Sequence, residues 1–176
     1  MSLRFVLVGT GRMGLSHLRA ALNLGLEPVG ICDLRPENLT KAAEQAGLSA
    51  TDCFSDPAEL FAAHPGVDLV LIATTADSHR DLVERAAASG AKAVLCEKPM
   101  ATSVADCDAM ITACRAAGTR LAINHQMRFL EQYTRIQGEL QSGKFGPLAS
   151  MNVVAGCFGL SMNGSHYCEA LRWLSG

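Results

Sequence analysis

The sequence predicts a doubly wound α/β domain with a parallel sheet over residues 3–123, and three features of the chain lead to that prediction. Short apolar runs alternate with amphipathic stretches of helical length. Glycine or proline marks most of the boundaries between them. The run at 67–73 is apolar on both faces apart from Asp68, as in a strand covered by helices on each side. Strands and helices that alternate at these lengths form right-handed β-α-β units around a parallel sheet.

The first half of this domain begins with a β-rich run at 5–8 that ends at Gly9. Apolar residues at helical spacing follow over 12–24, and 29–32 is the second predicted strand. Pro36 begins the next predicted helix, because proline lacks the N–H that would be unpaired in a first helical turn. The remaining elements of this half are a helix that ends at Gly47, an extended piece at 53–54 and a short helix between Ser55 and Gly66.

The second half continues the same alternation. After the strand at 67–73, a helix is predicted at 78–89 and ends at Gly90, since glycine favours the left-handed conformation that closes many helices. The remaining predicted elements are a strand at 93–96, a helix at 103–117 ended by Gly118, and a strand at 121–124.

The pattern changes beyond residue 123, and residues 145–168 contain no Asp, Glu, Lys or Arg. Such an uncharged stretch predicts a surface that is covered by something else. The elements expected here are too few to bury a core of their own, because ordering each residue costs about 1.5 kcal/mol. We therefore expect a first domain at 1–123 and the incomplete start of a second α/β domain at 124–176. The elements predicted in it are a helix at 130–142, a strand at 148–155 and a helix at 165–174.

Composition and charge exclude several classes of function. The net charge of −2, from 15 Lys and Arg against 17 Asp and Glu, provides no basic face for nucleic acid. Apolar residues make up 49%, too many for a disordered chain. No run reaches the about 20 apolar residues that a membrane helix needs. The lack of a secretory leader, and an odd number of seven cysteines without a Cys-x-x-Cys pair, favour the reducing cytoplasm.

A glycine-rich turn follows the first predicted strand, in the pattern Gly-x-Gly-x-x-Gly. It opens a helix, and an acidic residue ends the second strand, which is the context that a dinucleotide-binding fingerprint requires. Gly9 permits a tight turn, Gly11 lets the backbone approach a diphosphate, and Gly14 lets helix and sheet pack closely. Arg12 and Met13 begin the helix whose N-terminal amides would face that diphosphate. The alternative is a glycine-rich turn without a ligand, and the context favours the dinucleotide.

The acidic residue at the end of the second strand is Asp33. Its carboxylate is expected to accept hydrogen bonds from the ribose hydroxyls of adenosine, which favours NAD. Arg35 lies two residues on and is able to hold the 2′-phosphate of NADP instead. The expected cofactor is therefore NAD or NADP, with NAD favoured.

Glu97, Lys98 and Pro99 directly follow the fifth predicted strand. Ligands of doubly wound sheets bind outside the carboxyl ends of the strands, where a lysine can meet them. The alternative is an exposed ion pair between Glu97 and Lys98. Near the end of the chain, His166 begins the last predicted helix. A lone histidine in such a place is more often structural, so its role depends on its companions.

Five short motifs occur in sequence order: Gly9-x-Gly11-x-x-Gly14; Ala73-Thr74 followed by His79; Glu97-Lys98-Pro99; Asn124-x-x-x-Arg128-Phe129; and Gly164-x-His166-x-x-Glu169 with Arg172-Trp173-Leu174. Together they resemble the glucose–fructose oxidoreductase, inositol dehydrogenase and rhizopine catabolism (Gfo/Idh/MocA) family. The resemblance extends over essentially the whole chain, and its Glu-Lys-Pro triplet is quite specific.

The resemblance implies an NAD(P)-dependent oxidoreductase with a Rossmann fold, which transfers a hydride between a nicotinamide cofactor and a sugar, cyclitol or related polyol. It also implies a carboxyl-terminal domain that supplies substrate contacts and forms a homo-oligomer, most of it beyond residue 176. By position, Lys98 matches the active-site lysine and His166 the histidine proposed for proton transfer. The residues implied at the cofactor are Gly9, Gly11, Arg12, Met13, Gly14, Asp33, Arg35, Ala73, Thr74, His79, Glu97, Lys98 and Asn124.

These roles are chemically consistent, because a neutral imidazole can accept a hydroxyl proton while a lysine ammonium orients the oxygen. Two positions depart from the family. Met162 stands four residues before His166, where family dehydrogenases often have Asp, and Thr75 replaces a common proline. At His79, a capping or structural role competes with a cofactor contact.

Two other interpretations remain open. One is a non-catalytic NAD(P)-binding module or sensor subunit, which Met162 favours and the retention of Lys98 and His166 disfavours. The other is a homo-oligomer in which residues 145–168 pair with another chain. No metal site is expected, since the cysteine and histidine spacings match no zinc pattern. His17 and His64 support no prediction of function.

Overall fold

The computed structural model describes residues 2–154, 156 and 159–176, without the side chains of residues 160–162. The chain divides into two compact units, unit 1 at Met1–Ile123 and unit 2 at Asn124–Gly176. Within the described residues, no helix combines the length and the apolar character that crossing a membrane demands.

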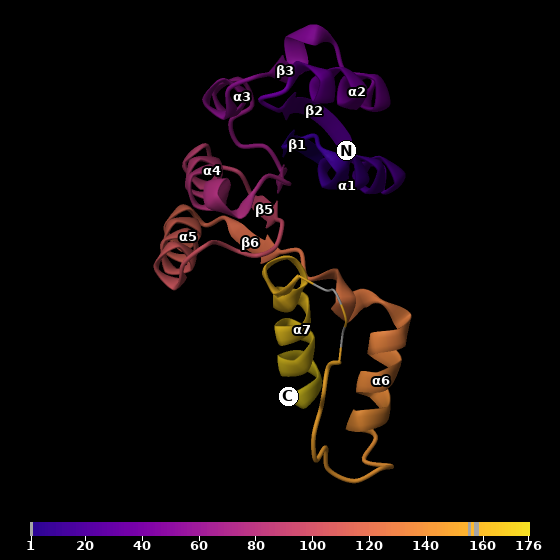
Figure 1. Ribbon diagram of the computed structural model, residues 1–176. Helices are drawn as coiled ribbons and strands as arrows, with labels where there is room; N and C mark the ends of the chain where they lie inside the picture. Colours follow the sequence, from indigo (N-terminus) through magenta and orange to yellow (C-terminus); the bar gives the residue numbers. More distant parts are fainter. Residues whose placement is uncertain (1, 155, 157–158) are drawn as a thin grey trace. The chain divides into compact units, whose positions relative to one another are not determined.

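Unit 1 is built on a parallel sheet (Figure 1). Its strands are β1 (Arg4–Val8), β2 (Glu27–Cys32), β3 (Cys53–Phe54), β4 (Leu69–Ile72), β5 (Ala93–Cys96) and β6 (Arg120–Ile123). The six strands lie in the order β3-β2-β1-β4-β5-β6, and every neighbouring pair is parallel. In the centre, Phe5 of β1 pairs with Leu69 of β4. The chain therefore reverses its direction of travel across the sheet between β1 and β4, which is the position where doubly wound folds bind their ligands.

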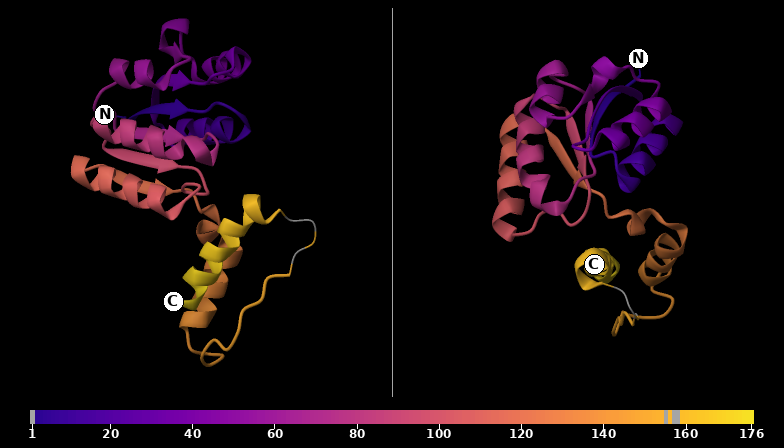
Figure 2. Two further views of the ribbon diagram at one scale, coloured as in Figure 1. Left: turned by 60° about the vertical axis from the view of Figure 1, so that its left-hand side comes forward. Right: turned by 45° about the horizontal axis from the view of Figure 1, so that its top comes forward.

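Helices cover both faces of this sheet (Figure 2). They are α1 (Arg12–Asn23), α2 (Pro36–Ala46), α3 (Pro57–Ala63), α4 (Ala76–Ala88) and α5 (Val104–Ala117). Side chains alternate between the faces, because successive residues of a strand point to opposite sides. Leu71 of β4 packs with α1 and α2, whereas Val70 and Ile72 pack with α3, α4 and α5. The parallel sheet is thus buried on both sides, as the apolar run at 67–73 predicts.

The strands and helices predicted for residues 3–123 are all present, with boundaries that differ by about two residues. Gly47 and Gly118 close α2 and α5 in the left-handed conformation, at φ 68° and 70°. The helix α4 begins at Ala76 rather than at residue 78. Unit 1 therefore has the predicted doubly wound architecture.

Unit 2 contains the short 3₁₀ helix η2 (Gln126–Phe129) and the helices α6 (Glu131–Gln141) and α7 (Leu160–Ser175). The helix α6 lies within the predicted 130–142. The helix α7 begins five residues before the predicted 165, where the amide of Asn163 donates to the carbonyl of Gly159 at 3.0 Å. Asn and Gly have low helix propensity, which tertiary packing commonly overrides, and Gly164, His166 and Ala170 of α7 are buried.

The strand predicted at 148–155 is wrong for residues 148–154, which form no strand. A strand needs a neighbour that pairs with its backbone N–H and C=O groups, and the described part of unit 2 provides none. Ala155, where the prediction ended, lies outside the described residues. So do Cys157 and the side chain of Met162.

Candidate functional site

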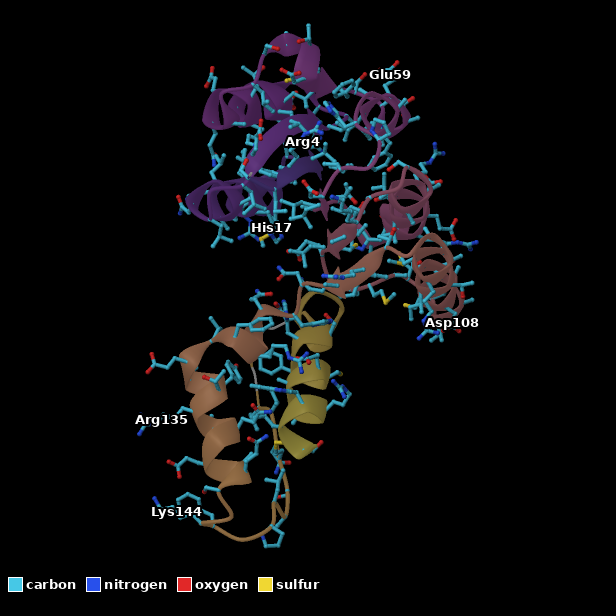
Figure 3. All side chains as sticks on the ribbon, turned by 180° about the vertical axis from the view of Figure 1, so that it is seen from behind. Arg4, His17, Glu59, Asp108, Arg135 and Lys144 are labelled. Carbon is cyan, nitrogen blue, oxygen red and sulfur yellow. The ribbon has the colours of Figure 1, made fainter. Side chains whose placement is uncertain are left out.

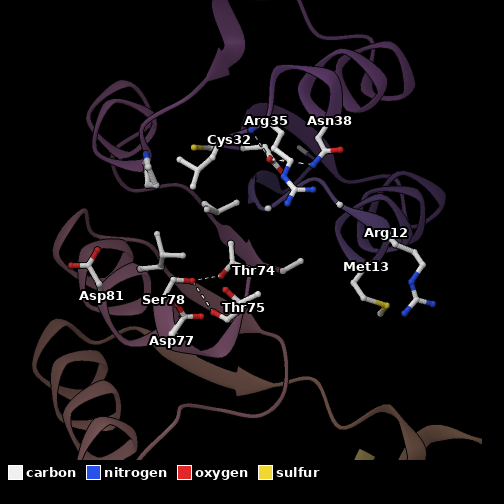
Figure 4. A pocket seen from close by; sticks show the side chains of 18 residues that line it. Arg12, Met13, Cys32, Arg35, Asn38, Thr74, Thr75, Asp77, Ser78 and Asp81 are labelled. Carbon is white, nitrogen blue, oxygen red and sulfur yellow. Dashed lines mark hydrogen bonds between the residues drawn. The ribbon is translucent and has the colours of Figure 1, made fainter. Parts of the chain in front are cut away.

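A cavity of about 640 Å³ lies at the carboxyl ends of β1, β2 and β4. Figure 4 shows Arg35 and Asn38 on one side of it and Thr74, Thr75 and Ser78 on the other. This is the reversal point of the strand order, where open α/β sheets bind nucleotides. The predicted cofactor residues that line the cavity are Gly9, Gly11, Arg12, Met13, Asp33, Arg35, Ala73 and Thr74.

The turn between β1 and α1 requires glycine at two positions for reasons inside the folded chain. Gly9 adopts φ 87°, and its amide donates to the carbonyl of Cys32 at 2.8 Å. A Cβ atom on Gly9 would stand 2.7 Å from the carbonyl oxygen of Ala73. A Cβ atom on Gly14, outside the cavity lining, would overlap the carbonyl oxygen of Gly9. Helix α1 therefore rests directly on the backbone of the turn.

Gly11 differs, because a Cβ atom there would meet no atom within 4 Å. Its backbone, at φ −68° and ψ −165°, is open to any residue. The first hydrogen bond of α1 runs from the amide of Leu15 to the carbonyl of Gly11, at 2.9 Å. The amides of residues 12–14 therefore precede the helical ladder and form the positive end of the helix dipole. Gly11 thus leaves open the space in front of a group of amides that suits a diphosphate.

Asp33, at the end of β2, is held by hydrogen bonds on both carboxylate oxygens. Oδ2 accepts from the amide and the hydroxyl of Thr10, at 2.7 and 3.1 Å. Oδ1 accepts from the amide of Arg35 at 2.9 Å and from the side chain of Asn38 at 3.3 Å. Burial alone would raise the pKa of Asp33, but the hydrogen bonds from Arg35, Thr10 and Asn38 outweigh it and hold the pKa below 3.8. A fixed negative charge therefore lines the cavity at neutral pH.

The opposite wall is formed by the start of α4. The hydroxyl oxygen of Ser78 lies 2.7 Å from Thr74 Oγ1 and 2.8 Å from the carbonyl of Thr75. A hydrogen bond from the Thr75 side chain holds the pKa of Asp77 below 3.8. The sequence prediction missed Asn38, Thr75, Asp77 and Ser78. Thr75, Asp77 and Ser78 lie shortly after Ala73-Thr74, between the end of β4 and the first turn of α4, and that position is the signal that could have identified them.

Glu97 and Lys98 follow β5 and do not belong to the cavity lining. Glu97 Oε1 lies 2.7 Å from His17 Nε2, and Oε2 accepts from the amide of Lys98 at 3.2 Å. The Lys98–Pro99 peptide bond is cis. His17, which supports no prediction of function from the sequence, is thus the partner of a predicted site residue.

His79 is fully buried in α4. Its Nδ1 lies 3.0 Å from the carbonyl oxygen of Pro99 and 3.3 Å from that of Met100, and its Nε2 lies 3.2 Å from that of Thr74. The ring therefore joins the segment after β4 to the segment after β5. This geometry favours the structural role over a contact with the cofactor.

The remaining predicted residues, Asn124 and His166, lie in unit 2. His166 is buried on α7, and its ring meets the ring of His125 edge-on, with centroids 5.6 Å apart. Arg128 Nη2 lies 3.5 Å from Glu169 Oε1, and the Arg128 guanidinium stands over the ring of Trp173 at 5.5 Å. Two of the five sequence motifs therefore come together within unit 2. The predicted catalytic residues, Lys98 and His166, belong to different units.

Comparison with known proteins shows where this architecture occurs. Residues 3–125 match the family described as "Oxidoreductase family, NAD-binding Rossmann fold". D-apiose dehydrogenase from Paraburkholderia graminis is 37% identical over 141 residues, which cover 80% of this chain and 36% of that protein. Inositol 2-dehydrogenase from Salmonella typhimurium is 32% identical over 149 residues, covering 83% of this chain and 44% of that protein. The chain thus spans less than half the length of these relatives.

Solved structures of an oxidoreductase and a dehydrogenase are also similar to this chain. An oxidoreductase from Agrobacterium radiobacter, in complex with NAD⁺, L-tartaric acid and magnesium, is 30% identical with a TM-score of 0.86. The match covers 99% of this chain and 55% of that one. The WlbA dehydrogenase from Bordetella pertussis, in complex with NADH and UDP-GlcNAcA, is 28% identical with a TM-score of 0.86, and the match covers 100% of this chain and 59% of that one.

Proposed function

The chain belongs to the Gfo/Idh/MocA oxidoreductase family with an NAD-binding Rossmann fold, and on that premise we propose that its cavity binds NAD in preference to NADP. The observation that carries dinucleotide binding is the glycine turn, where Gly11 leaves space open before the first amides of α1. The fixed carboxylate of Asp33 supports NAD, because it suits ribose hydroxyls and repels a 2′-phosphate. Arg35, on the same wall, is the residue that would favour NADP (Figure 4).

For the reaction, we propose hydride transfer between the cofactor and a sugar, cyclitol or related polyol. The nicotinamide ring supplies the hydride acceptor when it is bound. The Lys98 ammonium would orient the substrate hydroxyl and stabilise the negative charge that develops on its oxygen. The His166 ring would accept the hydroxyl proton. The names of the D-apiose and inositol dehydrogenases support this substrate class.

Titration of the protein with NADH and NADPH, followed by nicotinamide fluorescence, tests the cofactor proposal. We expect tighter binding of NADH, and Asp33→Ala should weaken NADH by about tenfold while NADPH binding is retained or improved. Arg35→Ala is the matched control, which should leave NADH affinity within about twofold. Folded protein that binds neither nucleotide would refute the proposal.

The catalytic proposal is tested by oxidation of a panel of polyols with NAD. Lys98→Met and His166→Asn should each lower kcat by at least about 100-fold while NADH affinity stays near that of the wild type. Variants with undiminished turnover would remove these residues from the mechanism.

We also propose that unit 2 belongs to a substrate and oligomerisation domain, and that the protein is a cytoplasmic homo-oligomer. Large apolar side chains of unit 2 are exposed, including Phe129 at 80%, Phe145 at 71% and Val154 at 95%. Exposed apolar side chains of this size support the proposal of an interface in unit 2. The six cysteines that the structure describes are free thiols, which fits a reducing compartment. Light scattering in solution tests the oligomer, and a monomeric mass would contradict it.

A further inference from the structure

His17 and Glu97 meet because of the way α1 and β5 present their side chains. Gly14 packs on the turn after β1, and His17 lies nearly one helical turn later on the same side of α1. Along β5, Leu95 packs toward α1 and Cys96 toward the opposite face. Glu97 continues this alternation and returns to the α1 side. Figure 3 labels His17 among the side chains of unit 1.

The contact between these two residues is short and shielded. His17 Nε2 and Glu97 Oε1 are 2.7 Å apart, with side chains that are 15% and 6% exposed. An ionised carboxylate only accepts hydrogen bonds, so with Glu97 ionised the hydrogen of this pair is on His17 Nε2. A hydrogen bond to a charged group is about twice as strong as a neutral one, and a buried carboxylate depends on such bonds. His17 is therefore a strong determinant of where the Glu97 carboxylate lies.

Glu97 in turn fixes the backbone of residues 97–100, which we call the lysine segment. The amide of Glu97 donates to the carbonyl of Ile72 at 2.9 Å and so continues the pairing of β5 with β4. Its carboxylate accepts from the amide of Lys98. On the other side of Lys98, the carbonyl oxygens of Pro99 and Met100 face the buried ring of His79. The lysine segment is thus held from α1 through His17 and from α4 through His79.

The lysine segment lies where the second half of a dinucleotide is expected. The cavity at the ends of β1, β2 and β4 suits the adenosine and the diphosphate. In a doubly wound fold, the second nucleotide lies across the other half of the sheet, beyond the reversal point. The next strand on that side is β5, which the lysine segment follows.

We propose that His17 is a positioning residue which, through Glu97, fixes the lysine segment for the nicotinamide half of the cofactor. This inference rests on the proposed function, since it assumes that the cavity holds the rest of the dinucleotide. It assigns His17 no contact with substrate. The loss of its hydrogen bond should weaken ligands that carry nicotinamide and spare those that end at the diphosphate and its ribose.

Isothermal titration of the protein with NADH and with ADP-ribose separates these two effects. ADP-ribose contains the adenosine, the diphosphate and a ribose but lacks the nicotinamide. For His17→Leu, we expect the Kd of NADH to rise by about tenfold and that of ADP-ribose to stay within about twofold. His17→Gln, whose side-chain amide donates from nearly the position of Nε2, should restore NADH affinity.

The same titrations also provide the results that would overturn the inference. His17→Leu that binds NADH as the wild type does, or that loses both ligands equally, would overturn it. So would wild-type protein that binds NADH no more tightly than ADP-ribose, although the proposed function would then stand. Wild-type protein that binds neither ligand would overturn the proposed function itself.

A second pair of variants covers the case in which His17→Leu does not fold. His17→Gln reaches Glu97, whereas His17→Asn is one methylene shorter and does not. We expect NADH to bind His17→Asn about tenfold more weakly than His17→Gln, with equal affinity of the two variants for ADP-ribose. Equal NADH affinity of the two variants would overturn the inference.

Discussion

Substitutions at Gly11 and Gly14 separate two different reasons for glycine in one turn. A Cβ atom on Gly14 would overlap the carbonyl oxygen of Gly9, which is backbone and cannot rotate away. A Cβ atom on Gly11 would enter open space at the cavity. Gly14→Ala should therefore destabilise the fold, and Gly11→Val should leave it nearly intact but block the diphosphate.

We expect Gly14→Ala to lower the free energy of unfolding by about 3 kcal/mol, near the upper end of the range for overpacked sites. The turn cannot relax, because the Gly9 amide is hydrogen-bonded to the Cys32 carbonyl and Gly9 packs against the backbone of Ala73. For a unit of this size, that cost corresponds to a fall in Tm of about 10 °C. Gly11→Val should cost only about 1 kcal/mol, the usual loss for a poor N-cap residue.

For NADH binding, Gly11→Val should be the more damaging of the two substitutions. A diphosphate that is displaced from the start of α1 loses at least two charge-assisted amide hydrogen bonds, each about 1.5 kcal/mol. The Kd of NADH for Gly11→Val should therefore rise by at least about 100-fold. Circular dichroism melting gives Tm and fluorescence titration gives Kd. A Gly14→Ala protein that melts within about 2 °C of the wild type, or Gly11→Val with undiminished NADH affinity, would refute the reasoning.

Three further predictions concern stability and thiol reactivity. Burial holds the pKa of His64 below 6.5, so protonation of His64 favours the unfolded chain. The free energy of unfolding, measured with urea, should therefore fall as the pH drops through about 6.5. The fall should be smaller in His64→Gln. Ser103→Ala removes the cap that accepts from the amide of Asp106 at 3.1 Å, and should lower Tm by about 4 °C, or about 1 kcal/mol. Burial raises the pKa of Cys32 and Cys96 to about 12, so a thiol reagent at pH 8 should leave both unlabelled in the native protein.

Each of these predictions has a clear contrary result. Equal pH dependence in the wild type and His64→Gln would contradict the first. Unchanged melting of Ser103→Ala would contradict the second, for which Ser55→Ala is a control, because Ser55 is exposed and the cap of α3 is Asp56. Labelling of Cys32 at the rate of the exposed Cys168 would contradict the third.

The sequence predicts the elements of unit 1 well because their signals are local. Apolar runs and helical spacing identify the strands and helices, and Gly47 and Gly118 end α2 and α5 where the pattern predicts. The strand predicted at 148–155 fails over residues 148–154 for the opposite reason. Strand formation depends on a pairing partner elsewhere in the chain, and an apolar run alone does not reveal one.

The core of the cavity is also predictable from the sequence, because its signals are local. Gly9, Gly11 and Asp33 form a local fingerprint, and the strand order of a doubly wound fold brings the end of β4, with Thr74, beside them. The contact of His17 with Glu97 joins residues 80 positions apart. No spacing or composition near either residue indicates that contact, so it emerges only from the folded chain.

The position of β1 in the sheet has a consequence for biosynthesis. This strand precedes the other five strands of the sheet in the chain, yet it lies in the centre, and its pairing with β4 joins Phe5 to Leu69. Until Leu69 leaves the ribosome, one edge of an apolar strand has no partner, and β2 and β3 cover only the other side. Unpaired edges and distant parallel pairings slow folding and favour aggregation. We therefore expect the nascent chain to be most prone to aggregation before β4 is made.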